Sequence, residues 1–386
     1  MSQPSKWERS AEYWRTLPPV TNLQLMLGIF FLFTSFGLVM AFINRTWVYV
    51  PLTFVSAFIS GAFSVAWAFA GFRRVIWLLC ILFPLQMGTY ILLGKLTSPH
   101  LTPFEQMDFS RDVVTHRLAV EGVFGMFCIL IAYSMLAAFI GKEGRRVFGA
   151  MAEVRLATEV HQALVPALAQ RVGGFEFCGA SVPSGQIGGD LVDLMEHDGK
   201  WTAYVADVSG HGVPAGMIMA MVKSAARMGS SNGASLSSFL ADLNRVLLSV
   251  SAPNVFVTFA CISGAAGGSI QFALAGHLPI LHYRKRLQAV EERTVANLPL
   301  AIVADAQFEA ANIECEDGDL LAILTDGLTE AADSRGQELG LEPLKEVLLK
   351  SAAQPLQQIV TELGNRALAQ GKQVDDQTVL LVRRSG

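Results

Sequence analysis

KWTAYVADVSGHG, residues 200–212, contains the pattern on which the architecture of the C-terminal half depends. The apolar and β-branched run from Trp201 to Val208 predicts a buried strand. Asp207 lies at the end of this strand, and Ser-Gly-His-Gly then forms a turn into a predicted helix. A carboxylate buried at a strand end needs a partner, because burying an unpaired charge is costly. The stretch therefore indicates both a sheet and a chemical site at its edge.

Similar short runs lie on both sides and predict further strands. They are FEFCGAS (175–181), DLVDLM (190–195), VFVTFACIS (255–263), SIQFALAG (269–276), PILHYR (279–284), DLLAILTDG (319–327) and TVLLVRR (378–384). Asp198-Gly199 between two runs is a strong hairpin signal. Helices are expected at Pro214–Met228, Leu236–Ser249, Pro343–Lys350 and Leu356–Gln370. Strands in hairpins with clustered helices predict an α+β domain built on antiparallel sheets.

Carboxylates gather where these strands begin or end. They are Asp190 and Asp193 after GQIGG, Asp207, Asp326 with Glu330 one helical turn beyond, and Asp375 and Asp376 before the last strand. Taken alone, any one Asp-Gly pair, such as Asp326-Gly327, predicts only a turn. An all-oxygen set at several strand ends suits Mg²⁺ or Mn²⁺, which prefer carboxylate ligands. Two such ions can activate a water and clamp phosphoryl oxygens.

The composition indicates a second, membrane-embedded part. Apolar residues make up 52% of the 386 residues and charged residues only 16%, against about 25% in soluble domains. The net charge of −4 argues against a nucleic-acid partner. The five cysteines have no C-x-x-C spacing, which disfavours a disulfide framework or a zinc site and fits a reducing cytosol.

Four apolar runs follow an N-terminal segment (1–21): 22–43, 48–71, 75–94 and 119–141. Each is about 20 residues or longer, enough to cross a bilayer core of roughly 30 Å. An all-α region of four transmembrane helices (22–141) is therefore expected. Ionisable residues are almost absent from the runs, with Glu121 near a headgroup position. This favours a membrane anchor, which could also relay a signal, over a transporter or a sensor pocket.

Flanking cations predict the orientation. Three groups belong to one side: Lys6, Arg9 and Arg15; Arg73 and Arg74; Lys142, Arg145 and Arg146. The other side holds Arg45, and Lys95, Arg111 and Arg117 diluted by acidic residues. We expect a multi-pass protein of the cytoplasmic (inner) membrane, with both termini and the C-terminal domain in the cytoplasm.

Residues 142–169 predict a linker helix, because apolar residues recur at spacings of three and four. The stripe comprises Val147, Met151, Val154, Ala157, Val160, Leu164 and Leu168. It could pair with its copy in a homodimer or pack onto its own domain, and the pattern leaves both open.

A series of motifs in order from Thr158 to Arg384 resembles one family. The motifs are EVHQALVP, GASVPSGQIGGDLVDL, YVADVSGHGVPAGMIMAMVKSAAR, FVTFACI, ALAGHLPILHYR, LPLAI, GDLLAILTDGLTEAAD, LGLEPL and DDQTVLLVRR. They look like the stage II sporulation protein E branch of the protein phosphatase 2C (PPM-type) superfamily. The resemblance implies a domain (170–386) of two sandwiched antiparallel sheets flanked by helices. It also implies two Mn²⁺ or Mg²⁺ ions and hydrolysis of phosphoserine or phosphothreonine on a protein.

The resemblance also assigns roles to residues. It implies that Asp207 bridges both metals, that the Val208 carbonyl is a ligand, and that Asp326 and Asp375 complete the second metal's shell, with Asp376 as the alternative to Asp375. Asp190 would touch a metal or lie one hydrogen bond away. Gly188, Gly189 and Gly210 would allow close approach of the backbone.

The catalytic residues implied are Asp207 and Asp326, with His211 as a candidate general acid. His277 could be either a phosphate contact or a turn residue. No counterpart of the phosphate-holding arginine of eukaryotic relatives is recognisable. The nearest relatives act on a phosphoserine of anti-sigma-factor antagonists, and activity in this branch is often controlled through the helix before the domain.

Two other functions would also fit parts of the sequence. A sensor histidine kinase would use His161 in TEVHQALVP as phosphoacceptor, but the Asp-x-Gly-x-Gly box is missing. His161 is therefore expected to be an exposed helix residue. A non-catalytic scaffold with the phosphatase fold is disfavoured because the matching acidic residues are all present.

Overall fold

The computed structural model describes residues 17–43, 50–73, 75–97, 111–230, 235–251, 254–265 and 269–385. Lys6, Arg9, Arg15, Arg45 and Arg74, on which the predicted orientation partly depends, lie outside the described residues. The chain divides into two compact units, Met1–Ala150 and Met151–Gly386. Each is described by itself.

The N-terminal unit contains long apolar helices. They are α2 (Pro19–Ile43), α3 (Val50–Arg73), α4 (Ile76–Thr97) and α5 (Arg111–Leu164), the last extending beyond this unit. Among the described residues, three segments are long and apolar enough to cross a membrane: Pro19–Met40, Pro51–Arg73 and Thr115–Leu164. The apolar part of α4, Trp77–Leu93, is shorter. The predicted count of four spans is therefore not confirmed, although four helices are present.

Small residues allow α2 and α3 to pack closely. A Cβ atom on Gly37 would lie 2.7 Å from the Ala57 Cα, and one on Gly61 would lie 2.3 Å from the Thr34 Oγ1. Close backbone approach through glycine is a common basis of helix association in membranes. On α5, Glu121 is buried and forms an ion pair with Arg117 at 2.8 Å.

The C-terminal unit is built on two antiparallel sheets. One has the order β1-β2-β11-β10-β7-β8 and the other β3-β4-β5-β6-β9. The strands are β1 (Leu168–Val172), β2 (Phe175–Val182), β3 (Leu191–His197), β4 (Lys200–Val208), β5 (Val257–Ala265), β6 (Ile270–Ala275), β7 (Ile280–Arg284), β8 (Ala289–Arg293), β9 (Ala311–Ile313), β10 (Leu320–Leu324) and β11 (Gln377–Arg384). The predicted hairpin is confirmed: His197 pairs with Lys200, and Asp198 and Gly199 have φ of 50° and 75°.

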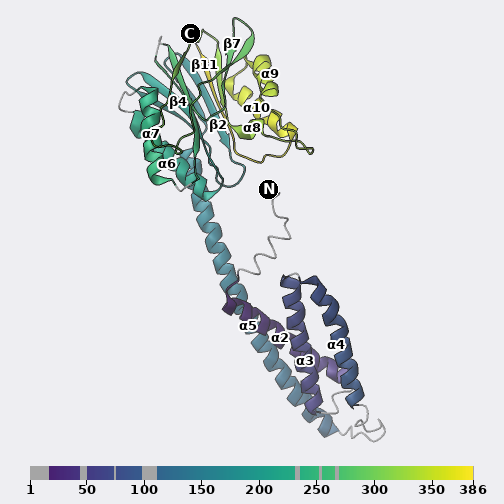
Figure 1. Ribbon diagram of the computed structural model, residues 1–386. Helices are drawn as coiled ribbons and strands as arrows, with labels where there is room; N and C mark the ends of the chain where they lie inside the picture. Colours follow the sequence, from purple (N-terminus) through teal and green to yellow (C-terminus); the bar gives the residue numbers. More distant parts are fainter. Residues whose placement is uncertain are drawn as a thin grey trace. The chain divides into compact units, whose positions relative to one another are not determined.

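Helices cover both outer faces of the two sheets (Figure 1). They are α6 (Val213–Ser230), α7 (Leu236–Val250), α8 (Asp326–Thr329), α9 (Glu342–Ser351) and α10 (Leu356–Gln370). Helices α6 and α7 pack on the five-stranded sheet around Phe259, and α9 and α10 pack on the six-stranded sheet around Leu381. A third core, which includes Trp201, fills the space between the sheets. The α+β sandwich predicted for the C-terminal half is confirmed.

Candidate active site

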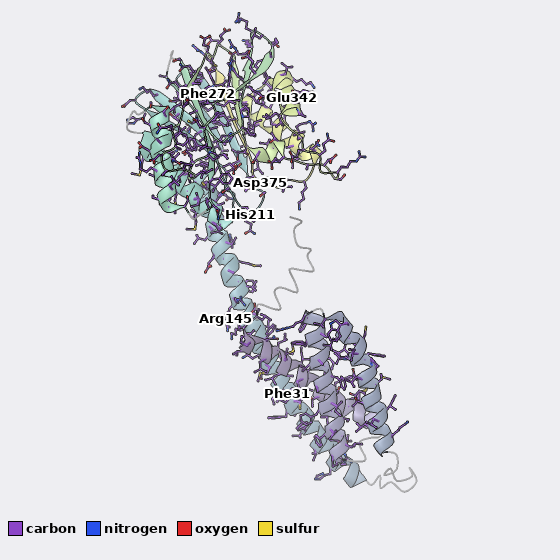
Figure 2. All side chains as sticks on the ribbon, in the orientation of Figure 1. Phe31, Arg145, His211, Phe272, Glu342 and Asp375 are labelled. Carbon is purple, nitrogen blue, oxygen red and sulfur yellow. The ribbon has the colours of Figure 1, made fainter. Side chains whose placement is uncertain are left out.

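The sheet topology brings the predicted acidic residues to one edge of the sandwich. Asp190 directly precedes β3, and Asp207 is the penultimate residue of β4, which pairs with β3 in register. Asp326 follows β10, and Asp375 precedes β11, which pairs with β10. Each sheet therefore contributes two carboxylates. Figure 2 shows Asp375 and His211 at the same end of the domain.

Asp190 is fixed across the two sheets by a hydrogen bond. The Thr325 Oγ1, at the end of β10, donates to the Asp190 Oδ2 at 2.8 Å. The Thr325 hydroxyl in turn accepts from the Thr378 amide on β11 at 2.9 Å. All three residues are buried. The carboxylate is thus held in one orientation by the opposite sheet.

The acidic residues raise one another's pKa. Burial raises the pKa of Asp207 to about 6, and the charge of Asp326 adds to this effect. Burial and the charge of Asp207 raise the pKa of Asp190 well above its ordinary value. Burial and the charge of Asp375 raise the pKa of Asp326. Carboxylates held close together with raised pKa values are typical of functional sites.

Asp375 and Asp376 differ sharply in their surroundings. Asp376 is 3% exposed and both of its carboxylate oxygens are engaged. Its Oδ1 accepts from the Ser184 amide at 2.7 Å, and its Oδ2 accepts from the Gly189 amide at 2.6 Å. Asp375 is exposed, and its Oδ1 accepts only from the amide of Asp376 among the contacts of the described chain.

The glycine loop before β3 (184–190) passes too close to its neighbours for side chains. A Cβ on Gly188 would lie 2.4 Å from the Asp376 Oδ2, and one on Gly189 would lie 2.8 Å from the Val208 carbonyl oxygen. Glycine is thus required at both positions. The loop brings the Asp190 carboxylate and the Val208 carbonyl, both predicted ligands, to the same place.

Other predicted residues have different surroundings. Asp193 is paired with Arg227 through two hydrogen bonds of 2.9 and 2.8 Å, which indicates a structural role. His211 is exposed in the β4–α6 loop. His277 faces the Leu278 carbonyl across 3.3 Å, and burial lowers its pKa to about 4. Burial, followed by the charge of Asp326, raises the pKa of Glu330.

The expectation that His161 is exposed is wrong. This residue, in the last turn of α5, is only 7% exposed, and its Nε2 accepts a hydrogen bond from the Gly188 amide at 3.3 Å. A polar residue near a helix end predicts exposure when the helix is considered alone. The partner lies 27 residues further along the chain, and only the folded domain brings the two together.

A separate buried cluster joins His282, Cys315 and Asp319, whose ligand atoms lie within 4.8 Å of one another. Arg284 lies 3.2 Å from the Asp319 carboxylate, and Arg293 donates to the His282 Nδ1 at 3.5 Å. The proton of a neutral His282 therefore lies on Nε2, toward Asp319. Arginines and a protonated nitrogen disfavour a metal, so this cluster is structural.

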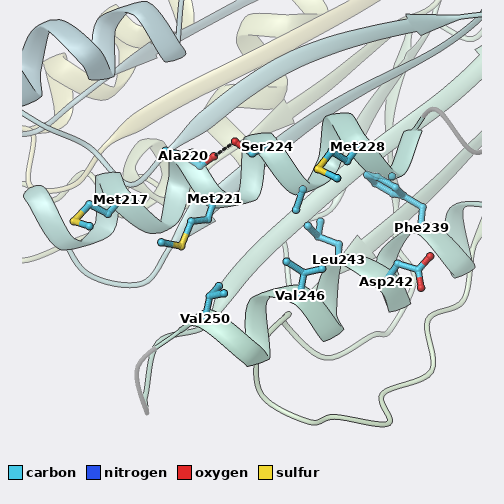
Figure 3. Close-up of a pocket in the computed structure, with 12 residues that line it drawn as sticks. Met217, Ala220, Met221, Ser224, Met228, Phe239, Asp242, Leu243, Val246 and Val250 are labelled. Atoms are coloured by element: carbon cyan, nitrogen blue, oxygen red, sulfur yellow. Dashed lines mark hydrogen bonds between the residues drawn. The ribbon is translucent and has the colours of Figure 1, made fainter.

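A groove of about 920 Å³ lies between α6 and α7 (Figure 3). Its lining is mostly apolar and includes the exposed Met217, Met228 and Val246. None of the predicted metal-ligating residues lines it. An apolar groove offers a phosphoryl group no hydrogen bonds, so the groove is distinct from the candidate active site.

The donor set fits divalent cations. Carboxylate and carbonyl oxygens are the ligands that Mg²⁺ and Mn²⁺ prefer. Asp190, Asp207, Asp326 and Asp375 supply carboxylate oxygens at this edge, and they are the candidate residues to hold such a cation.

This sandwich, with acidic residues at one edge, is the architecture of PP2C-type phosphatases, and solved structures of that class are similar to it. The SiaA-PP2C domain of Pseudomonas aeruginosa matches with a TM-score of 0.53 and 17% identity, over 62% of this chain and 98% of that chain. The RsbU and RsbW domains of Rv1364c from Mycobacterium tuberculosis match with a TM-score of 0.52 and 24% identity, over 58% of this chain. The match covers 63% of that chain, just under two thirds.

The sequence comparisons identify the family. Residues 197–385 match the family model of stage II sporulation protein E (SpoIIE). The phosphoserine phosphatase RsbU of Bacillus subtilis is 26% identical over 235 residues, which are 60% of this chain and 70% of RsbU. The C-terminal part of the chain is a SpoIIE phosphatase domain of the PP2C type, in the class of enzymes that hydrolyse phosphoproteins.

Proposed function

We propose that the chain is a membrane-anchored phosphatase that removes phosphate from serine or threonine of a regulatory protein, with two Mn²⁺ or Mg²⁺ ions. The observation that carries the proposal is the meeting of four acidic residues from both sheets at one edge, where burial and neighbouring charge raise the pKa of Asp207 to about 6. Such ions, when bound, would activate a water molecule and neutralise phosphoryl oxygens.

The residues of the site take distinct roles in this proposal. Asp207 would be shared by both ions, the Val208 carbonyl would ligate one of them, and Asp326 and Asp375 would complete the ligand set of the second. The two engaged oxygens of Asp376 favour Asp375 as the ligand, with Asp376 holding the glycine loop. Asp190, oriented by Thr325, would either ligate an ion itself or hold a ligand by a hydrogen bond. His211, exposed in the adjoining loop, is placed as the candidate proton donor to the leaving serine oxygen.

The substrate proposal comes from the relatives. RsbU is a phosphoserine phosphatase, and we propose that the present substrate is a phosphoserine on a small protein of the anti-sigma-factor antagonist kind. The test compares phosphoserine, phosphothreonine and phosphotyrosine peptides with the full chain in nanodiscs, with Mn²⁺ or EDTA. Release of phosphate from the first two, only with metal, supports the proposal; preference for phosphotyrosine opposes it.

The membrane part is proposed as an anchor for a cytoplasmic phosphatase domain. The division into 1–21, 22–141, 142–169 and 170–386 is part of this proposal, as are the cytoplasmic termini. The last boundary lies a few residues earlier than predicted, because α5 ends at Leu164 and β1 begins at Leu168. Three apolar segments of sufficient length support it. Cysteine labelling in intact cells at Lys142 and Ser385, after single substitution to Cys, tests the orientation. Labelling by an impermeant reagent from outside would contradict it.

A homodimer through α5 is also proposed. In the apolar stripe, the side chains of Val147, Met151 and Val160 are 37%, 62% and 52% exposed. In contrast, Leu164 and Val165 pack on the core of their own domain. The exposed part of the stripe is thus available to a second copy, and the end of the helix is not. Crosslinking of Met151→Cys in membranes tests this pairing.

A further inference from the structure

The last turn of α5 contacts the loop that carries Asp190. The Gly188 amide, buried between the helix and the sandwich, donates to the His161 Nε2 at 3.3 Å. A buried amide without an acceptor destabilises the folded state, so this amide depends on the histidine. Because Nε2 accepts, the proton of the neutral ring lies on Nδ1.

Three successive loop residues are held from three different elements. The Gly188 amide is held by His161 on α5, the Gly189 amide by Asp376 before β11, and the Asp190 carboxylate by Thr325 after β10. Two of these contacts come from the two strands that also carry Asp326 and Asp375. The contact from α5 is the one that comes from outside the sandwich.

Helix α6 packs closely against the glycine loop beside the His161 ring. A Cβ on Gly216 of α6 would lie 2.5 Å from the Ile187 Cγ2 and 4.0 Å from the His161 Cδ2. The Lys223 Nζ, also on α6, donates to the Leu164 carbonyl at the end of α5. Lys223 lies 3.5 Å from the Asp193 carboxylate. The helix end is therefore fixed on the same helix that follows the Asp207 turn.

We propose that His161 is a positioning residue of the metal site, which acts through the Gly188 amide to set the backbone of the glycine loop. The proposal rests on the proposed metal-dependent function. Among the contacts of the described residues, His161 bonds to the loop backbone and not to a predicted metal ligand, so its effect is on how well the loop presents Asp190. Residues that orient ligands in this way change metal affinity by about 10–100-fold when they are altered.

The experiment compares two amides at one position. In His161→Gln the side-chain oxygen reaches the place of Nε2, whereas in His161→Asn the amide is one methylene shorter and reaches only the place of Nδ1. Gln162→Ala, on the neighbouring exposed residue, is the matched control. Mn²⁺ binding to the full chain in detergent is measured by the electron paramagnetic resonance signal of free Mn²⁺, a readout that needs no turnover. Thermal unfolding in EDTA verifies that each variant is folded.

We expect His161→Asn to weaken Mn²⁺ binding by about tenfold or more. His161→Gln and Gln162→Ala should bind as the unaltered chain does. Equal affinity in His161→Asn and the unaltered chain would overturn the proposal, as would His161→Gln binding as weakly as His161→Asn. If the unaltered chain itself binds no Mn²⁺, the proposed metal-dependent function fails, and this result is distinct from the two others.

Discussion

The Thr325 hydroxyl donates to the Asp190 carboxylate at 2.8 Å and so connects the two sheets at the edge where the acidic residues meet. Asp190 precedes β3 of one sheet, and Thr325 follows β10 of the other. This hydrogen bond orients the carboxylate before any ion binds. It also gives the buried Asp190 Oδ2 a hydrogen-bond donor, which apolar neighbours could not supply.

Replacing Thr325 with Val keeps the shape of the side chain and removes the hydroxyl. We expect the variant to lose about 1–3 kcal/mol of stability, since Asp190 and the Thr378 amide both lose a buried partner. Thermal unfolding of the full chain measures this loss. Thr325→Ser retains the hydroxyl and should stay close to the unaltered chain; a loss in Thr325→Val no larger than in Thr325→Ser would contradict the role of the hydroxyl.

The neighbours Asp375 and Asp376 should respond differently to the same change. Asp375→Asn is expected to abolish metal-dependent hydrolysis while the melting temperature in EDTA hardly changes, because this carboxylate is exposed. Asp376→Asn places an amide N–H against the Ser184 or Gly189 donor, so it should lower the melting temperature. Parallel activity and melting measurements verify this. Full activity of Asp375→Asn would remove it from the ligand set.

A methyl group in the glycine loop should disturb the site according to the space available. Gly188→Ala would bring a Cβ to 2.4 Å from the Asp376 carboxylate, so the loop or the carboxylate must move. We expect at least a tenfold fall in activity at limiting Mn²⁺, by the size of effect usual for residues that orient metal ligands. Gly185→Ala, with no atom within 4 Å of its added Cβ, is the matched control. Equal effects of the two changes would contradict this explanation.

The raised pKa values predict a dependence of stability on pH in the absence of metal. The folded state of Asp207 has a pKa of about 6, against an ordinary value of 3.8, so between these values the folded protein binds more protons than the unfolded one. The contribution of Asp207 to stability in EDTA should therefore be fully present below about pH 4 and should be lost as the pH rises through 6.

Added Mn²⁺ should reverse this loss, because an ion takes the place of the protons and binding releases them. The rise in melting temperature caused by Mn²⁺ should be larger at pH 7 than at pH 5. Calorimetric scans of the full chain, with Asp207→Asn as control, give the comparison. An equal rise at both pH values would show that the ion binds elsewhere.

Local pattern was sufficient to predict an α+β domain with antiparallel sheets, and the family resemblance added the two-sheet sandwich. Alternation and turn residues predicted the strand that ends at Asp207 and the hairpin at Asp198-Gly199, because both depend on residues close in the sequence. The length of the membrane helices was harder to predict. In α4 the apolar segment is Trp77–Leu93, shorter than the run of the sequence suggested.

Contacts between distant residues account for what the sequence missed. Asp375 and Asp376 are adjacent in DDQT, and what distinguishes them is the burial of Asp376 against the Ser184 and Gly189 amides, 192 and 187 residues away. His161 is likewise unremarkable on its helix until Gly188 is brought against it. Side-chain roles of this kind depend on the tertiary fold, whereas strand positions do not.

The most direct test of the account is phosphate release from a phosphoserine peptide by the full chain in nanodiscs, with Mn²⁺ and with EDTA, beside Asp207→Asn and Asp326→Asn. The account predicts turnover only with Mn²⁺ and a loss of at least a hundredfold in both variants, as for residues that hold catalytic groups. Turnover that persists in EDTA or in Asp207→Asn would contradict the central claim that this edge of the sandwich is the metal-dependent active site.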